Sequence, residues 1–235
     1  WGLQPRPVLA DSEFGNSWEV RDALHTRGYP YCVQVEPTTV AWRDRPEPPI
    51  PRPRPGRGRP RTRPRRDDLP TPAPLRAVAQ ALPASAWRTV TWRAGSKGPM
   101  TSRFARCPVW CAHEWRRGGP FAPREETCLV EWPPDEPHPT KYWLADLRGE
   151  PLGLRRLVRL AKGRWRIEQD YRELKDELGL DHFEGRSYTG WYHHVTLVSL
   201  AYAFLVLERA RAKKNLAADL APDPALAPAD AAGAG

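Results

Sequence analysis

The run from Gly163 to Leu178, GRWRIEQDYRELKDEL, constrains this chain most, because its spacing is that of an amphipathic helix. At about 100° per residue, Arg164, Glu168 and Lys175 fall within roughly 40° of one another. The adjacent sector is apolar and consists of Ile167, Tyr171, Leu174 and Leu178. An ordinary surface helix carries its charges opposite the apolar stripe. Here the polar line borders the stripe, which predicts a carboxylate at the edge of the core and suits a metal-dependent phosphodiester site.

The chain is basic, with 37 Lys and Arg against 28 Asp and Glu, a net charge of +9 and a pI near 9.7. Such a balance favours a polyanionic partner such as nucleic acid. Arginines between residues 52 and 66 supply a large share of the excess, so a basic segment on a near-neutral domain is the alternative. The 235 residues can bury one sizeable core, and the length suggests one or two domains.

The chain shows no secretory signal pattern. Its longest apolar run, Val195 to Leu207, is too short for a bilayer, which needs about 20 apolar residues. We expect this run to form a buried helix and the protein to be cytoplasmic, with no membrane partner. The chain begins at Trp1, and we expect it to be a fragment of a longer protein.

Residues 1–41 have the pattern of a strand, a helix and a second strand. A short apolar run from Val8 to Ala10 ends in Asp11, a helical pattern covers 18–27, and a strand is expected at 31–35. The strands of such a unit are normally parallel, and sites form at their carboxyl ends. Asp11 stands at such an end.

The rest of the chain divides by composition. Residues 42–86 are expected to be a solvated linker rich in Pro and Arg, with a phosphate-tracking arm as the alternative. Residues 87–147 carry short apolar runs punctuated by Gly and Pro, which predict a β-rich insertion. Residues 148–212 are expected to be helical, and residues 213–235 resemble a disordered tail.

Four cysteines admit two interpretations. Cys107, Cys111, His113 and Cys128 could form a zinc site, although the spacing lacks a tight paired knuckle. Small buried thiols on strands account for the same cysteines, and we favour that interpretation.

Asp11 and Glu168 are the candidate metal ligands. Two carboxylates brought together repel each other unless a divalent cation such as Mg²⁺ lies between them. The alternatives are a helix cap for Asp11 and pairing with Arg164 or Arg172 for Glu168. Arg164, Lys175 and Arg172 are candidate phosphate ligands, and solvated surface charge is their alternative.

Two segments resemble a known family. The stretch from Arg164 to Leu205 resembles the carboxyl-terminal signature of bacterial insertion-sequence transposases of the DDE class, Tyr-x2-Arg-x3-Glu-x6-Lys. Arg164, Glu168 and Lys175 match it, whereas Ala161 stands at the Tyr position. The segment VLADSEFG, residues 8–15, is similar to the strand of the family's second Asp.

The resemblance implies an α/β fold, with a partial ribonuclease-H-like core, a β-rich insertion and carboxyl-terminal helices. It assigns catalysis and metal binding to Asp11 and Glu168, with Mg²⁺ or Mn²⁺ as cofactor. DNA at element ends and target DNA would be the partners, a homodimer is possible, and the compartment would be the bacterial cytoplasm. The implied reaction is metal-dependent strand cleavage followed by strand transfer.

The family's first Asp lies upstream of the second, and ten residues precede Asp11 in this sequence. We therefore expect this fragment to be inactive by itself. Two other functions remain open at this point. One is a non-catalytic DNA-binding remnant, and the other is a metal-dependent nuclease without strand transfer.

Overall fold

The computed structural model describes residues 6–47, 69–95, 98–112, 123–148 and 152–219. It divides into two compact units, Trp1–Trp165 and Arg166–Gly235. The first unit holds a sheet with helices on its faces, and the second holds two helices. None of the described helices has both the length and the apolar character needed to cross a membrane.

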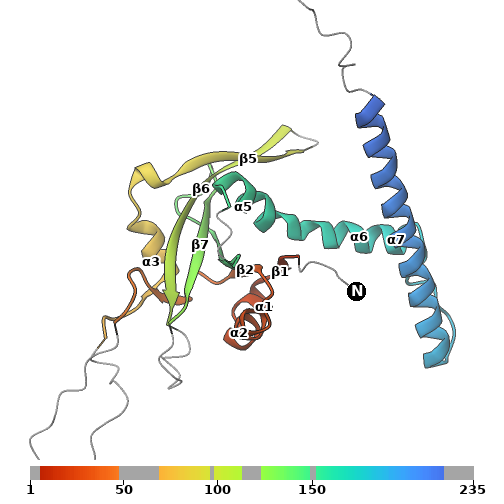
Figure 1. Cartoon of the computed structure of the whole chain (residues 1–235), viewed down its shortest axis with the longest axis horizontal. Coiled ribbons are helices and arrows are strands. Elements are labelled where there is room, and N and C mark those ends of the chain that lie inside the picture. Colours follow the sequence, from red (N-terminus) through yellow and green to blue (C-terminus); the bar gives the residue numbers. More distant parts are fainter. Residues whose placement is uncertain (1–5, 48–68, 96–97, 113–122, 149–151, 220–235) are drawn as a thin grey trace, which may run out of the picture. The chain divides into compact units, whose positions relative to one another are not determined.

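A mixed sheet of eight strands organises the first unit (Figure 1). Its order is β1-β2-β8-β7-β6-β3-β4, with β5 also paired to β6. The strands are β1 (Val8–Ala10), β2 (Tyr31–Val35), β3 (Val40–Trp42), β4 (Ala73–Pro74), β5 (Arg88–Gly95), β6 (Gly98–Cys111), β7 (Glu125–Trp132) and β8 (Lys141–Asp146). β1 and β2 are parallel, whereas the other described pairs are antiparallel. The predicted α/β class and the parallel βαβ unit are confirmed, and the fold is consistent with a ribonuclease-H-like core.

Helices lie in the segments expected to be helical, 18–27 and 148–212, and also at 12–15 and 75–80, where no helix was expected. They are α1 (Ser12–Gly15), α2 (Trp18–Thr26), α3 (Leu75–Gln80), α5 (Leu154–Ala161), α6 (Trp165–Asp176) and α7 (Tyr188–Asp219), with 3₁₀ turns η2 (Ala84–Ala86) and η3 (Lys162–Arg164). Gly28 follows α2 and Gly179 follows α6, and their φ values are 79° and 65°. Glycine adopts this left-handed region readily, which explains why the helical runs end there.

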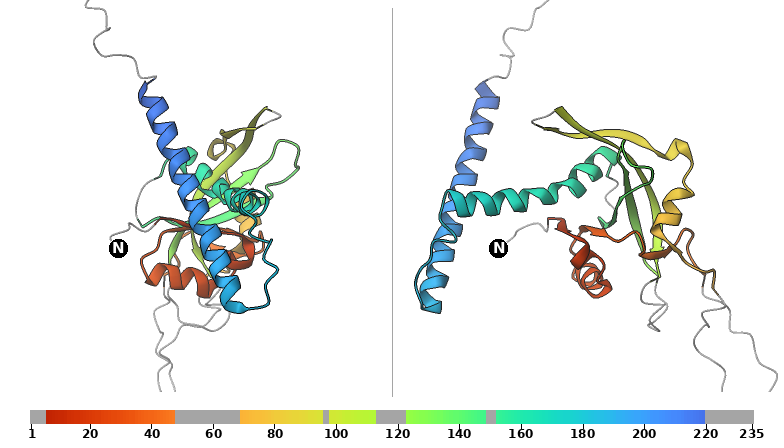
Figure 2. Two further views of the ribbon diagram at one scale, coloured as in Figure 1. Left: turned by 90° about the vertical axis from the view of Figure 1, so that its right-hand side faces the viewer. Right: turned by 180° about the vertical axis from the view of Figure 1, so that it is seen from behind.

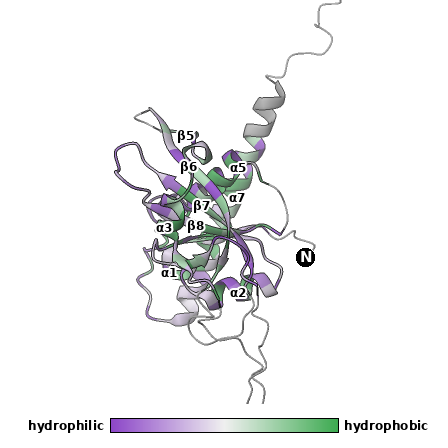
Figure 3. Cartoon of the chain, turned by 90° about the vertical axis from the view of Figure 1, so that its left-hand side faces the viewer, coloured by the Kyte–Doolittle hydropathy of each residue, from purple (hydrophilic) through white to green (hydrophobic). Residues whose placement is uncertain are grey.

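The sheet has a core on each face because successive strand side chains point in opposite directions. On β7, Cys128 and Val130 pack on the face covered by α3, and Leu129 packs on the face covered by α5. β2 and β8 alternate in the same way. Figures 1 and 2 show α3 and α5 on opposite sides of the sheet, and Figure 3 shows the hydrophobic character of β7 and β8. The unit is therefore a three-layer arrangement.

The strands predicted as an insertion do not stand apart from the βαβ unit. β8 pairs antiparallel with β2, from Tyr31 opposite Asp146 to Val35 opposite Tyr142. This pairing gives β2, the second strand of the sheet, a partner on each side. The β-rich segment and the opening unit consequently share one sheet.

Residues at both ends of the predicted linker, 42–86, are part of the folded unit in the structure. Leu69 is buried against Trp42, and Leu75 on α3 is fully buried in the core. The apolar residues after position 68 therefore belong to the folded unit, which the high Pro and Arg content of the preceding stretch obscures. The stretch 48–68 lies outside the described residues.

The second unit pairs α7 with α6. The Tyr202 hydroxyl donates to Asp170 Oδ1 at 2.7 Å, and Arg209 Nη1 lies 2.5 Å from Glu173 Oε2. The expected burial of the Val195–Leu207 run is wrong, because most of its side chains are exposed and Val198 is the buried one. The run is apolar around most of its circumference, and Tyr202 within it is bonded to Asp170 of α6. α7 also continues to Asp219 into the predicted tail, and residues 220–235 lie outside the described residues.

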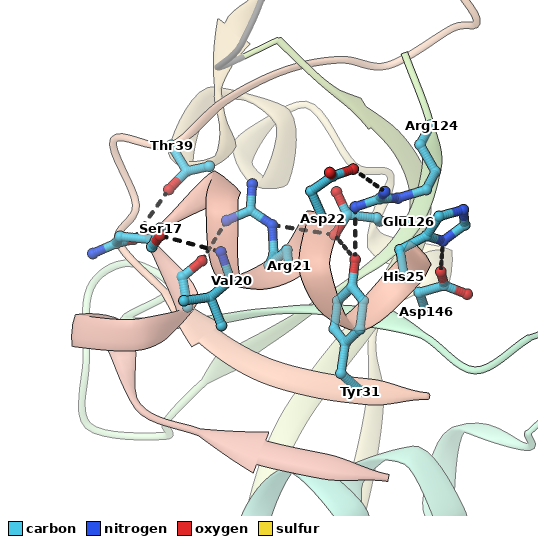
Figure 4. A network of polar contacts seen from close by, with 12 residues as sticks. Ser17, Val20, Arg21, Asp22, His25, Tyr31, Thr39, Arg124, Glu126 and Asp146 are labelled. Carbon is cyan, nitrogen blue, oxygen red and sulfur yellow. Dashed lines mark hydrogen bonds and ion pairs between the residues drawn. The ribbon is translucent and has the colours of Figure 1, made fainter. Parts of the chain in front are cut away.

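A buried ion pair attaches α2 to the sheet (Figure 4). Arg21 on α2 is 1% exposed and Glu126 on β7 is 2% exposed, and Arg21 Nε lies 3.3 Å from Glu126 Oε1. The Tyr31 hydroxyl on β2 donates to the same oxygen at 2.6 Å. Arg124 Nη2 donates to the Tyr31 hydroxyl at 3.2 Å. Groups from α2, β2 and the start of β7 therefore meet around one carboxylate.

The environment keeps these groups in their paired protonation states. Burial, with the nearby Glu126 carboxylate, raises the pKa of Tyr31 far above its usual value. The phenol therefore stays protonated and donates a hydrogen bond to Glu126. Burial lowers the pKa of Arg21, but the Glu126 charge raises it, and the net direction is upward. Arg21 therefore stays charged, and its burial depends on the counter-charge of Glu126.

Removing the charge of Glu126 should destabilise the protein strongly. We expect Glu126→Gln to lower the free energy of unfolding by about 3 kcal/mol, because a buried Arg21 loses its counter-charge. Urea denaturation followed by circular dichroism would measure this loss. Glu125→Gln, at an exposed neighbour on β7, should change stability by less than about 0.5 kcal/mol. Similar losses in the two variants would contradict the role of the ion pair.

Gly15 allows α1 to lie against β2. A Cβ at Gly15 would lie 1.8 Å from the carbonyl oxygen of Gln34, which is a backbone atom that a rotamer change cannot move. We expect Gly15→Ala to cost about 1–3 kcal/mol of unfolding free energy through overpacking. Thermal or urea unfolding would measure it. Gly153→Ala is the matched control, since a Cβ there meets nothing within 4 Å, and an equal cost at Gly153 would refute the explanation.

Candidate active site

Asp11 lies directly after β1, at the carboxyl end of a parallel strand. It is half-buried, and its Oδ1 accepts a hydrogen bond of 3.2 Å from the backbone nitrogen of Glu13. Asp11 is therefore the N-cap of α1, as the alternative interpretation predicted. The cap uses one carboxylate oxygen, so capping and metal binding are compatible.

The turn that leads into α6 lies beside β1. A Cβ at Gly163 would lie 3.3 Å from Leu9 Cδ1, and η3 contacts β1. The sequence predicts one helix from Gly163, whereas the structure has a 3₁₀ turn there and α6 begins at Trp165. Arg164, a candidate phosphate ligand, ends this turn and is half-buried. Residues about 150 positions apart thus come together near the strand that carries Asp11.

Cationic side chains fix the entry to α6. Lys162 Nζ lies 2.5 Å from Glu131 Oε2 on β7 and 4.6 Å from the centre of the Trp92 ring. Burial lowers the pKa of Lys162, and the bond to Glu131 partly offsets this effect. On β5, the guanidinium of Arg93 stacks 3.9 Å from the ring centre of Trp165. The sequence does not indicate the Lys162–Glu131 pair, because neither neighbourhood carries a local signal for it.

Glu168, Arg172 and Lys175 form an exposed polar line on α6. Asp170 and Glu173, which bind α7, lie roughly 140–200° around the helix from Glu168 at 100° per residue. The polar line therefore lies on the side of α6 away from α7. The expected place of Glu168 at the edge of a core differs from the structure, since the glutamate is exposed.

The apolar seam next to this line is also largely uncovered within the second unit. Ile167 and Tyr171 are exposed, while Leu174 and Leu178 are half-buried. α7 contacts α6 through Asp170 and Glu173, and Leu174 lies only about 40° from Asp170 around the helix, so α7 borders the seam but leaves Ile167 and Tyr171 exposed.

The candidate metal ligands belong to different units, with Asp11 in the first and Glu168 in the second. Their convergence on one ion therefore stays a prediction. Their donor chemistry suits Mg²⁺ or Mn²⁺, because both offer carboxylate oxygens. In the described part of the chain, no group of three or more His, Cys, Asp or Glu residues lies close enough to hold a metal ion.

Cys32, Cys107 and Cys128 are buried thiols, as we favoured, whereas Cys111 is partly exposed. Cys107 on β6 and Cys128 on β7 lie opposite each other and are buried in the core. Burial raises the pKa of Cys32 to about 12, so this thiol stays protonated. His113, the fourth residue of the zinc alternative, lies outside the described residues.

Residues 1–99 match a family model described as DDE superfamily endonuclease. The matched segment contains β1, Asp11, α2 and β2 and ends before α6. The search of curated proteins gave no match.

The match supports the DDE-class resemblance inferred from residues 8–15, whereas the signature at 164–205 lies outside the matched segment, and the insertion-sequence origin stays a prediction. Endonucleases of this class generally use divalent metal ions, and the match supports a nuclease-type enzyme at that coarse level. By this match, residues 1–99 of the chain are similar to the DDE superfamily endonucleases.

Proposed function

We propose that this chain is the DNA-processing part of a transposase, which cleaves and joins DNA strands at the ends of an insertion sequence with the help of a divalent metal. The observation that supports the proposal most is the position of Asp11. This carboxylate follows a parallel strand inside the segment that matches the DDE endonucleases, and parallel strands present sites at their carboxyl ends.

Asp11 and Glu168 would hold the metal through their carboxylate oxygens. A bound Mg²⁺ or Mn²⁺ would activate the attacking oxygen and stabilise the leaving oxygen of the displacement. Arg164, Arg172 and Lys175 would hold the phosphates on either side of the scissile bond. Arg offers a planar fork to phosphate oxygens and Lys a point charge, so these residues contribute positioning and charge stabilisation.

Two alternatives make different predictions for the same variants. In a non-catalytic DNA-binding remnant, Glu168→Gln would leave DNA affinity unchanged with or without metal. A nuclease without strand transfer would require Glu168 but would yield no joined ends. Analysis of reaction products on end-sequence DNA separates this nuclease from a transposase.

Metal binding tests the carboxylate pair directly. We expect the chain to bind Mn²⁺, and we expect Asp11→Asn and Glu168→Gln each to weaken binding about tenfold or more, since even outer-shell changes cost about 10- to 100-fold. Electron paramagnetic resonance of free Mn²⁺ measures the affinity without requiring turnover.

Glu177→Gln is the control for this measurement, because it removes an exposed carboxylate just after α6. It should leave Mn²⁺ affinity unchanged. If Asp11→Asn or Glu168→Gln bound Mn²⁺ as tightly as the unaltered chain, the shared metal site would be refuted.

Salt dependence tests the phosphate line. Lys175→Ala should weaken DNA binding by a similar factor for all sequences and reduce the salt slope by about 1, because one phosphate contact and its released counterion are lost. Fluorescence anisotropy at several salt concentrations measures both effects. Arg166→Ala is the matched control, since Arg166 is exposed on α6 and lies about 180° around the helix from Lys175. Equal slopes for Lys175→Ala and the unaltered chain would exclude Lys175 from the interface.

A further inference from the structure

Three arginines cover the outer side of α5. Arg155, Arg156 and Arg159 are exposed, and at about 100° per residue they lie within an arc of roughly 100° around the helix. The opposite side of α5 holds Leu157 and Val158, which are buried in the core cluster on this face of the sheet. The three guanidinium groups therefore point away from the sheet and form one surface, which we call the arginine face.

The segment around α5 offers these arginines no counter-charge. Residues 152–164 contain five Lys or Arg and no Asp or Glu. One of the five, Lys162, is directed into the unit and pairs with Glu131. Among the described residues, no carboxylate forms an ion pair with an arginine of the arginine face. Within the described part of the chain, the charge of this face is therefore not neutralised.

Helix stability does not account for the arginine face. Arg155 and Arg156 lie in the first turn of α5, which has no acidic residue and no side-chain bond at its N-cap. The positive end of the helix dipole disfavours cations in that turn. Arg159 lies four residues after Arg155, and like charges at this spacing repel each other. The three charges therefore oppose the helix that carries them, and a bound polyanion would relieve this repulsion.

The excess of positive charge belongs to the first unit, which contains α5. Residues 1–165 carry 29 Lys and Arg against 17 Asp and Glu, and without the stretch 48–68 they still carry 21 against 15. Residues 166–235 carry 8 against 11. The electrostatic attraction of a polyanion is therefore directed to the first unit.

α5 packs over the strand that leads to Asp11. Leu9 on β1, two residues before Asp11, packs against the core cluster that contains Leu157 of α5. The turn η3 continues α5 and contacts β1. The arginine face and Asp11 thus belong to the same unit, and α5 belongs to the layer that covers the strand of this carboxylate.

We propose that Arg155, Arg156 and Arg159 bind the sugar–phosphate backbone of duplex DNA next to the scissile bond. This inference rests on the proposed function and adds a DNA-binding surface that is separate from the polar line on α6. The planar fork of Arg matches phosphate oxygens, and side chains four residues apart on a helix are about 5–6 Å from each other. Contacts to phosphates carry no sequence information, so this surface would hold DNA of any sequence.

Removal of the three charges in the full chain tests the inference. The triple-Gln variant combines Arg155→Gln, Arg156→Gln and Arg159→Gln. Fluorescence anisotropy gives its affinity for two duplexes of unrelated sequence between about 50 and 200 mM salt. For both duplexes we expect affinity at about 100 mM salt to fall about tenfold or more. The salt slope should fall by about 2–3, since each phosphate contact contributes about 0.9.

Stability separates loss of binding from loss of folding. The melting temperature of the triple-Gln variant, followed by circular dichroism, should be unchanged or higher, because the removed charges oppose the helix. Arg156→Gln alone should reduce the salt slope by about 1, which keeps the inference testable if the triple-Gln variant folds poorly.

Two controls test the placement of the charge and its nature. Arg76→Gln removes an exposed arginine from α3, on the opposite side of the sheet from α5 (Figure 1), and should leave affinity and slope unchanged. The triple-Lys variant, which replaces the same three arginines with lysine, keeps the charge and should retain most of the affinity. An equal loss in the triple-Lys and triple-Gln variants would contradict a contact based on phosphate charge.

The outcomes separate this inference from the proposed function. Equal affinity and slope for the triple-Gln variant and the unaltered chain would overturn the arginine face and leave DNA binding elsewhere intact. A loss confined to one of the two sequences would also overturn it. Binding to phosphatidylglycerol vesicles that is tighter than binding to DNA, and that is lost in the triple-Gln variant, would overturn DNA as the partner of this face. If the unaltered chain bound neither duplex, both the arginine face and the proposed function would be refuted.

Discussion

The buried contact between Arg21 and Glu126 is the interaction on which the first unit most depends. A charge taken out of water costs several kcal/mol, so each partner makes the other necessary. Through Tyr31, the same carboxylate also holds β2. α2 is the crossover between β1 and β2, and β1 pairs along its short length with β2. The position of Asp11 at the end of β1 therefore depends on a charged pair located in a different part of the sheet.

Local patterns in the sequence predicted the local structure well. Short apolar runs between Gly and Pro indicated the β-rich segment 87–147 that contains β7 and β8, and the strand expected at 31–35 is β2. The pairing of β2 with β8 was not predictable, because it joins residues more than 100 positions apart and depends on which edge of β2 remains available. The Arg21–Glu126 pair has the same separation, and neither residue is unusual in its own neighbourhood.

In the candidate site, too, the local structure was predictable from the sequence and the long-range packing was not. The spacing of Arg164, Glu168 and Lys175 indicated one helix face. α6 carries Glu168 and Lys175, whereas Arg164 lies in the preceding 3₁₀ turn η3. The burial of that face was not predictable, because it depends on where α7 packs, and Asp170 and Glu173 bring α7 to the other side. An apolar helix such as α7 has no polar face to indicate its orientation, so composition alone suggested burial.

The pairing of β3 with β4 has a consequence for how this protein can vary. Val40 lies opposite Pro74 and Ala41 opposite Ala73, so the chain leaves and re-enters the sheet at neighbouring positions. The entropy of closing a loop grows only with the logarithm of its length. Connecting segments of very different length could therefore be exchanged between β3 and β4. Such an exchange would alter neither the register of the sheet nor β1, which Asp11 follows.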